Sequence, residues 1–285
     1  MRRVVVVTGA STGIGAAVVA DLARSGFRCF GTVRRDVDEA NVRASGAEPL
    51  RMDVADSASV AGAVANLRER LAGEQVWGVI HNAGIAGAGP WELLEEQTLR
   101  ETFEVNLFGV ARLNRLLLPD LRASRGRVVL MSSVSGRFGF PAMGPYCASK
   151  FALEALADTL RRELRPFGVH VTSIQPGPID TPIWEKSLSR FAEMYPTSTA
   201  YEMLLQKLER GARDSAKHAL PVSAVTAVVR RVLLSRRPPV RRIVLPWKAR
   251  MALAIFEWLP SRWIDRLVAG RFAAGSTRDS LKESG

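Results

Sequence analysis

Tyr146 and Lys150 could together carry proton-transfer chemistry. They lie four residues apart in the run Tyr146-Cys147-Ala148-Ser149-Lys150, so on a helix their Cβ atoms would be about 5–6 Å apart on one face. A phenol titrates near pH ~10 and is a poor acid or base at neutral pH. A nearby positive charge favours the phenolate and lowers the pKa of the tyrosine. The pair is therefore a candidate for general acid–base catalysis.

A glycine-rich segment near the start of the chain could bind a dinucleotide. It reads Thr8-Gly9-Ala10-Ser11-Thr12-Gly13-Ile14-Gly15. It follows an apolar strand-like segment and opens a helical pattern. Glycines at such a junction let the backbone turn tightly and approach a pyrophosphate at the helix N-terminus. The position of this turn predicts dinucleotide binding.

Short apolar segments alternate with helical patterns along the chain. The predicted strands are 3–8, 28–33, 48–52, 76–80, 127–131, 169–174 and 240–245. Among the predicted helices, one begins at Asp56 or Ser57, and two others span 148–165 and 219–235. This alternation predicts an α/β fold, a doubly wound parallel seven-stranded sheet flanked by helices, in a single domain with a C-terminal helical extension.

Three segments interrupt the alternation. They are a loop at 133–145, an insertion at 176–211 and an aromatic, basic extension at 247–272 with two helices separated near Pro260. Ligands of open α/β sheets bind beyond the carboxyl ends of the strands, where the first two segments lie. We therefore predict a catalytic domain at 1–246, which includes a substrate loop at 176–211, then the extension at 247–272. A disordered tail is expected at 273–285.

Composition fits a globular protein, with 47% hydrophobic and 24% charged residues in a chain of 285. Cys29 and Cys147 lack metal-ligand spacing and fit a reducing compartment, so no metal site is predicted. The first apolar run, at residues 4–7, is far shorter than the ~20 residues that span a bilayer, and we find no targeting sequence. A cytoplasmic protein is expected.

The net charge of +12 is unevenly distributed, because residues 221–285 contain 13 Lys/Arg but only 4 Asp/Glu. The simplest interpretation is a set of solvated basic faces, and no nucleic-acid partner is predicted. Basic residues at 248, 250, 262, 266 and 271 alternate with aromatic and apolar ones. We interpret this segment as a cover over the substrate pocket or an oligomer contact, with peripheral membrane contact through a basic amphipathic element as the alternative.

The glycine spacing, together with motifs further along, resembles the short-chain dehydrogenase/reductase family from Arg3 to about Thr181. The matching motifs are Asp53-Val54, Asn82-Ala83-Gly84, Asn106, Ser133, Tyr146, Lys150 and Pro176-Gly177. Ser133 precedes Tyr146 by 13 residues, as in the family's catalytic pair. His81 departs from the pattern, because many members have a second Asn there. The resemblance implies a Rossmann-type fold and an oxidoreductase that interconverts alcohols and carbonyls with NAD(P).

The resemblance also implies the catalytic roles of Asn106, Ser133, Tyr146 and Lys150. Tyr146 would be the general acid or base, and Lys150 would lower its pKa and hold the nicotinamide ribose. Ser133, with Ser132 as the competing candidate, would bind the substrate oxygen. Asn106 would hold a water that relays protons to Lys150.

The cofactor-binding residues implied by the resemblance extend from the glycine turn to the end of the sixth strand. They are Gly9, Ser11, Thr12, Gly13, Ile14, Gly15, Arg34, Asp53, Val54, Asn82, Ala83, Gly84, Tyr146, Lys150, Pro176, Gly177, Ile179 and Thr181. Asp53 and the Val54 N–H would contact the adenine, and Ile179 and Thr181 the nicotinamide carboxamide.

The end of the second predicted strand favours NADP(H) over NAD(H). It reads Thr32-Val33-Arg34-Arg35. NAD-selective sites place an acid at this position, whereas an arginine pairs with the 2′-phosphate of NADP. Arg34 occupies the position, and Ser11 could donate to the same phosphate. The alternative is that both arginines are only solvated surface residues.

The segment around Tyr146, Gly144 to Phe151, is similar to the retinol and hydroxysteroid dehydrogenase branch. This implies a lipophilic alcohol, ketone or aldehyde as substrate. Pocket candidates, each of which could equally be core, are Trp91, Phe138, Phe140, Met143, Trp184, Phe191, Met194 and Tyr195. The alternatives are a 3-oxoacyl reductase acting on carrier-linked chains and a non-catalytic NADP-binding sensor or scaffold. A homodimer or homotetramer, formed through the helices around Asn106 and Tyr146, is expected from the resemblance.

Overall fold

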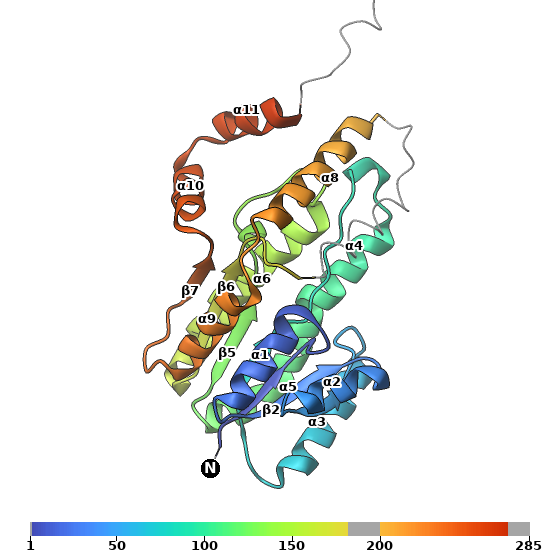
Figure 1. The fold of residues 1–285 in the computed structure, drawn as a ribbon. Coiled ribbons are helices and arrows are strands. Elements are labelled where there is room, and N and C mark those ends of the chain that lie inside the picture. Colours follow the sequence, from blue (N-terminus) through green and yellow to red (C-terminus); the bar gives the residue numbers. More distant parts are fainter. Residues whose placement is uncertain (1, 182–199, 273–285) are drawn as a thin grey trace, which may run out of the picture.

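The computed structural model describes residues 2–181 and 200–272. Its centre is a seven-stranded sheet with the order β3-β2-β1-β4-β5-β6-β7, in which all neighbouring strands are parallel (Figure 1). The strands are β1 (Val4–Val7), β2 (Arg28–Val33), β3 (Glu48–Arg51), β4 (Val76–His81), β5 (Arg127–Met131), β6 (His170–Pro176) and β7 (Arg241–Val244). The predicted fold class is confirmed.

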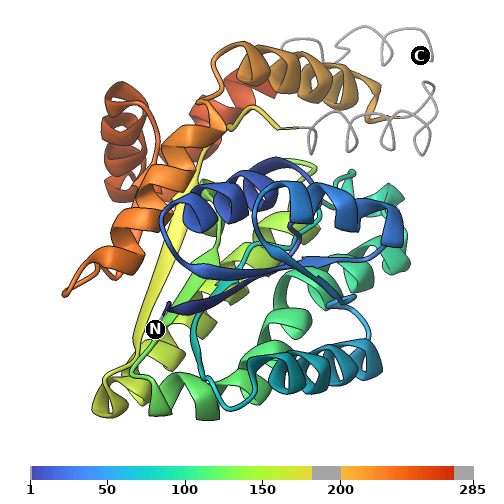
Figure 2. The ribbon, with the colours of Figure 1, turned by 60° about the horizontal axis from the view of Figure 1, so that its bottom comes forward.

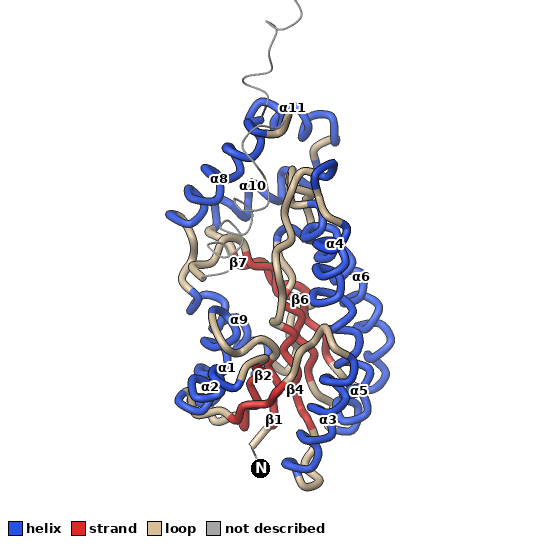
Figure 3. The backbone as a smooth tube through the Cα atoms, turned by 90° about the vertical axis from the view of Figure 1, so that its right-hand side faces the viewer, coloured by secondary structure: helices blue, strands red, loops and turns tan. Residues whose placement is uncertain are grey.

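Helices cover both faces of the sheet, because parallel neighbours must be joined by crossovers. The helices of the domain are α1 (Gly13–Arg24), α2 (Glu39–Ala44), α3 (Ser57–Leu71), α4 (Glu96–Phe103), α5 (Gly109–Ala123), α6 (Gly144–Leu164), α8 (Glu202–Lys217) and α9 (Val222–Leu234). Figure 3 shows α1, α2 and α9 on one side of the sheet and α3, α5 and α6 on the other.

Burial on both faces explains why the strands read as continuous apolar runs. In β1, Val4 and Val6 pack into the core on the side of α3, α5 and α6, whereas Val5 and Val7 pack on the side of α1 and α9. Successive side chains of a strand point to opposite faces, so each valine of β1 packs into one of the two cores.

The order of the strands reverses at β1. This strand pairs with β2 on one side and with β4 on the other. At such a switch point the loops that follow the two strands diverge and leave a crevice beyond their carboxyl ends. The glycine turn after β1 and the Asn82-Ala83-Gly84 segment after β4 lie at this crevice.

Most predicted elements are present, with shifted ends. Helix α6 begins at Gly144 rather than at the predicted residue 148, since a proline such as Pro145 is tolerated in the first turn, where its missing N–H is not needed. The predicted N-cap of α3 is Asp56, which accepts a hydrogen bond from the Ala58 N–H at 2.8 Å. Helix α8 lies partly inside the segment predicted as a substrate insertion and was not predicted.

The C-terminal extension consists of two helices, as predicted, with the break at Leu259-Pro260. They are α10 (Trp247–Trp258) and α11 (Ser261–Phe272). Helix α11 lies beside α8, which it contacts (Figure 2). None of the helices described combines the length and the apolar character that crossing a membrane requires. The predicted tail at 273–285 lies outside the described residues.

Candidate functional site

A cleft of about 810 Å³ opens at the carboxyl edge of the sheet. It is lined by every predicted catalytic or cofactor-binding residue except Gly15 and Asn106. These two pack directly behind it: Gly15 lies against the Gly9 carbonyl, and Asn106 is hydrogen-bonded to Ile85, which lines the cleft. The structure thus brings together residues that are spread from the first strand to the end of β6.

The glycine turn has the shape that a phosphate-binding loop requires. Gly9 and Gly13 have φ values of +66° and +57°, in the left-handed region that favours glycine. A Cβ on Gly15 would lie 2.1 Å from the Gly9 carbonyl oxygen, so only glycine fits. Thr12 is the N-cap of α1, but its side chain makes no capping hydrogen bond. The first N–H groups of α1 are therefore available to an anionic group, and the turn fits a pyrophosphate.

Asn82 holds this turn in place. Its Nδ2 donates to the carbonyls of Thr8 and Gly9 at 3.0 and 3.1 Å, and its own N–H donates to the Thr8 hydroxyl at 2.9 Å. The loops after β1 and β4 are thereby joined across the switch point. The role of Asn82 in the structure is mainly to shape the cofactor cleft.

Asp53, Arg34 and Arg35 line the end of the cleft beyond β2 and β3. Asp53 also forms the local turn, since its carboxylate accepts from the Ala55 N–H at 3.0 Å. Arg35 is paired with Asp38 through two hydrogen bonds of 2.9 and 3.0 Å. Arg34 is exposed and has no carboxylate partner among the described residues. It is the guanidinium at this end that remains available to a ligand.

The chain after β6 reaches back over the glycine turn. Pro176 and Gly177 line the cleft, and the Gly177 N–H donates to the Val244 carbonyl at 3.1 Å. Thr181 lies against Gly13, where a Cβ on the glycine would be 3.6 Å away. The buried Ile179 forms a β-bridge with Leu220. This segment therefore lines the cleft beside the N-terminal end of α1.

Ser133 and Tyr146 meet in the cleft. The Ser133 hydroxyl accepts from the Ser135 N–H at 3.1 Å and hydrogen-bonds Tyr146. Its competitor Ser132 is buried and packs close to Gly136 and Glu154. The geometry therefore favours Ser133 over Ser132 as the partner of the phenol.

Lys150 lies one helical turn after Tyr146 on α6, and burial shifts the pKa of both side chains. Burial raises the pKa of Tyr146 above its ordinary value, and the Ser133 hydrogen bond opposes the rise only in part. The buried Lys150 ammonium lies 5.6 Å from the centre of the Tyr146 ring and donates to the Met131 carbonyl at 2.9 Å. Desolvation of the phenol is thus the largest influence on its pKa, and the lowering by Lys150 stays a prediction.

Asn106 lies in η3 (Glu104–Phe108), one π-helical turn between α4 and α5. Such turns are rare and frequently mark functional sites. The Asn106 Oδ1 accepts from the Ile85 N–H at 2.9 Å, and its Nδ2 donates to the Ile85 carbonyl and to the Ser149 hydroxyl at 2.9 and 3.0 Å. The side chain therefore ties the loop after β4 to helix α6. Its proton-relay role stays a prediction.

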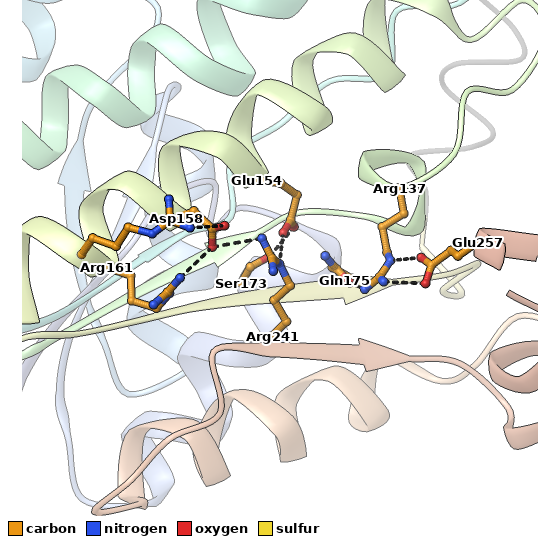
Figure 4. Close-up of polar contacts among 9 residues, drawn as sticks. Arg137, Glu154, Asp158, Arg161, Ser173, Gln175, Arg241 and Glu257 are labelled. Atoms are coloured by element: carbon orange, nitrogen blue, oxygen red, sulfur yellow. Dashed lines mark hydrogen bonds and ion pairs between the residues drawn. The ribbon is translucent and has the colours of Figure 1, made fainter. Parts of the chain in front are cut away.

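Glu154 is a buried charge that the sequence did not single out. It accepts from Arg241 at 2.9 Å and from the Ser173 hydroxyl, and Arg241 also pairs with Asp158 at 3.0 Å (Figure 4). These donors keep the pKa of Glu154 below its usual value although burial raises it. Burial lowers the pKa of Lys150 to about 8, and the negative charge of Glu154 opposes that fall. The spacing of four residues from Lys150 on α6 was the available signal.

The four pocket candidates that the structure describes, Trp91, Phe138, Phe140 and Met143, lie outside the lining of the cleft. Phe138 packs edge-on against Phe140 and against Phe256 of α10, at centroid distances of 4.9 and 5.9 Å. Trp91 packs near Gly144, and Met143 is the residue before α6. The other four candidates, at 184, 191, 194 and 195, lie outside the described residues. Cleft-lining residues that were not predicted include Ile85, Thr98, Thr102 and Val105.

His81, the departure from the family pattern, is buried and structural. Its Nε2 lies 3.0 Å from Oδ1 of Asn114. Burial lowers the pKa of His81 to about 4, so the ring is neutral at physiological pH. A neutral imidazole satisfied by Asn114 leaves the adjacent Asn82 free to hold the glycine turn.

Known proteins resemble this chain over nearly its whole length. The family model described as short chain dehydrogenase matches residues 3–190. The NADPH-dependent 3-dehydrocapnine reductase of Ornithobacterium rhinotracheale is 34% identical, over 93% of this chain and 95% of that protein. Retinol dehydrogenase 16 of Rattus norvegicus is 29% identical, over 93% and 87%. The crystal structure of a short-chain dehydrogenase from Streptomyces avermitilis superposes with a TM-score of 0.77 at 26% identity, covering 97% of this chain and 99% of that one.

Proposed function

The chain belongs to the short-chain dehydrogenase/reductase family and is an oxidoreductase acting on alcohol and carbonyl groups, and from this premise we propose that it interconverts a lipophilic alcohol and its ketone or aldehyde with NADP(H). The observation that carries the proposal is the meeting of Ser133, Tyr146 and Lys150 in the cleft beside the glycine turn. A sensor or scaffold would need the turn but not this acid–base set.

Different residues would bind the cofactor, bind the substrate and transfer the proton. The glycine turn and the N-terminus of α1 would hold the pyrophosphate of the cofactor, and Lys150 its nicotinamide ribose. When bound, NADP(H) supplies or accepts the hydride. Ser133 hydrogen-bonds the substrate oxygen and orients it, and Tyr146 donates a proton to that oxygen during reduction or removes it during oxidation.

The protonated form of Tyr146 suits the proton donation that carbonyl reduction requires. Because its pKa lies above the ordinary value, the phenol holds its proton at neutral pH. A protonated phenol beside Ser133 is prepared to donate to a carbonyl oxygen. Oxidation would first require its deprotonation.

The proposed preference for NADP(H) is supported by Arg34. It is exposed, lines the cleft and has no carboxylate partner among the described residues, whereas Arg35 is engaged by Asp38. The relative from Ornithobacterium is described as NADPH-dependent, which agrees with this proposal.

The substrate class is proposed from the relatives and from the sequence around Tyr146. Retinol dehydrogenase 16 is named for a lipophilic alcohol, and the segment around Tyr146 resembles the same branch. The excess of Lys and Arg in residues 221–285 favours one alternative, a 3-oxoacyl substrate on an acidic carrier protein.

Oxidation of NADPH against a panel of carbonyl compounds tests the proposed function. The panel contains steroid and retinoid carbonyls, long-chain aliphatic ketones and aldehydes, and 3-oxoacyl thioesters. We expect turnover with one of the lipophilic classes. Turnover restricted to the thioesters would replace the proposal with the acyl alternative, and turnover restricted to small polar carbonyls would contradict both.

The pH dependence of carbonyl reduction should report Lys150. Its pKa of about 8 lies below the ordinary value, so the ammonium is present below pH 8 and is lost above it. We expect kcat/KM to fall above that pH by about tenfold per further unit. Glu154→Gln removes the charge that raises the pKa of Lys150, so the fall should begin at a lower pH.

Asp158→Asn is the matched control for this experiment. Asp158 pairs with the same Arg241 as Glu154 does, at 3.0 Å, but it is not among the groups that shift the pKa of Lys150. The pH profile of Asp158→Asn should match the wild type. Equal profiles for Glu154→Gln and the wild type would show that Glu154 does not act on the titrating group.

We propose a homo-oligomer formed through α5 and α6. Phe108, the residue before α5, and Phe151 on α6 are 48% and 46% exposed. A second copy that packs against these helices would bury them.

A further inference from the structure

Helix α10 is fixed to the domain by one of its faces. Glu257 forms an ion pair with Arg137, which also donates to Gln175 at 3.1 Å (Figure 4). Phe256 packs edge-on against Phe138 at a centroid distance of 5.9 Å. These contacts determine which side of α10 faces inward.

The remaining surface of the two C-terminal helices is apolar and exposed. On α10, the exposed residues Trp247, Met251, Ile255 and Trp258 recur at the spacing of one helical stripe, and Trp258 is 90% exposed. On α11, Trp263 and Leu267 are exposed one turn apart. Scattered exposed hydrophobic residues are normal, but a stripe of large ones marks an interaction surface.

Positive charges flank this apolar surface. Lys248 and Arg250 on α10, and Arg262 and Arg266 on α11, are exposed. Of the two acidic residues in these helices, Glu257 is neutralised by Arg137, which leaves Asp265. The surface is therefore complementary to a negatively charged partner that also accepts apolar side chains.

The position of the helices relates this surface to the cleft. Helix α10 begins at Trp247, directly after β7 ends at Val244, so it leaves the sheet at the carboxyl edge where the cleft opens (Figure 1). The intervening Leu245 packs over Gly177, which lines the cleft: a Cβ on the glycine would lie 2.1 Å from Leu245 Cδ2.

We propose that α10 and α11 form a peripheral docking surface for an anionic lipid bilayer. Trp, Met, Ile and Leu side chains would enter the boundary between headgroups and acyl chains, and the Lys and Arg side chains would pair with the lipid phosphates. A second copy of the chain fits the surface less well, because it would bring the same positive charges together. The docking does not depend on which substrate the enzyme uses.

Vesicle co-sedimentation of the full chain tests the proposal. Phosphatidylcholine vesicles with and without phosphatidylglycerol are compared at about 0.1 M and about 1 M salt, which shortens the Debye length from about 10 Å to about 3 Å. We expect binding to the anionic vesicles at the lower salt, weaker binding at the higher salt, and a blue shift of tryptophan emission on binding. Failure to bind anionic vesicles at the lower salt overturns the proposal.

Two pairs of variants separate the apolar and the charged contributions. Trp258→Ser with Trp263→Ser should reduce the blue shift and weaken binding, and Arg262→Ser with Arg266→Ser should weaken binding about fivefold for each arginine removed. All four positions are exposed, and circular dichroism verifies the fold of each variant.

The matched controls lie at the opposite edge of the sheet, before β7. Leu234→Ser with Val240→Ser removes exposed apolar side chains, and Arg236→Ser with Arg237→Ser removes exposed charges. Both should bind vesicles like the wild type. Equal losses in controls and test variants would contradict the assignment to α10 and α11. A dimer in sedimentation velocity that Trp258→Ser with Trp263→Ser converts to a monomer would assign the surface to a second copy instead.

Discussion

Tyr146→Phe should reduce kcat/KM for carbonyl reduction by about 10²–10⁴-fold, the usual contribution of a general acid. The substitution removes only the hydroxyl that hydrogen-bonds Ser133, and the ring beside Lys150 remains. The cofactor cleft keeps its glycine turn, Asn82 and Arg34, so the affinity for NADPH should stay close to that of the wild type. The measurement combines steady-state reduction kinetics with NADPH fluorescence titration.

Tyr201→Phe is the matched control for this substitution. Its hydroxyl donates to Glu92 at 2.6 Å on the outer surface, so the variant loses a phenolic hydroxyl outside the catalytic set and should keep its turnover. Wild-type turnover in Tyr146→Phe would remove Tyr146 from the acid–base role. Loss of NADPH binding together with activity would instead assign the phenol to the cofactor site.

Arg34→Ala should weaken the use of NADPH by about 10–100-fold in kcat/KM, which corresponds to a charged hydrogen bond of about 1.5–3 kcal/mol. The reason is that Arg34 is the guanidinium at this end of the cleft without a carboxylate partner among the described residues, whereas Arg35 is held by Asp38. Use of NADH should change little, since NADH lacks the 2′-phosphate. Initial rates with both cofactors measure the change.

Arg43→Ala serves as the control for the loss of a positive charge nearby. Arg43 lies on α2 and pairs with Glu39 at 2.7 Å, outside the lining of the cleft. The variant should keep the wild-type ratio of NADPH to NADH use. A wild-type enzyme that prefers NADH, or an Arg34→Ala variant that loses both cofactors equally, would contradict the role given to Arg34.

The sequence predicts the sheet well because burial on both faces leaves a strong signal. The strands β2 and β5 have the predicted limits, and the seven apolar runs correspond to the seven strands. The start of α6 was missed because Gly144-Pro145 resembles a loop, although a proline is tolerated in the first helical turn. The apolar runs that predict the strands are a local signal, whereas the start of α6 depends on the structure that surrounds Gly144 and Pro145.

Site residues were predicted where a motif fixes their position, but their electrostatics were not. The burial of Tyr146, which raises its pKa, cannot be read from a spacing of four residues between Tyr146 and Lys150. Glu154 was missed since a glutamate inside a helix usually faces solvent, and its partner Arg241 lies 87 residues further along the chain. Phe138 packs outside the cleft, because its partner Phe256 belongs to the C-terminal extension, whose position could not be predicted from the sequence.

The contact between Arg137 and Glu257 joins positions 120 residues apart, and it has an evolutionary consequence. We expect the loop that follows Ser133 and the helix that carries Glu257 to be inherited together, because each supplies one partner of the ion pair. In relatives that lack this helix, the positions of Arg137 and Phe138 are released from selection for the contact and should vary independently of each other. A chimera that transplants residues 247–272 onto such a relative would also need Arg137 and Phe138. Without them, Glu257 and Phe256 would lack the partners that hold α10 against the domain.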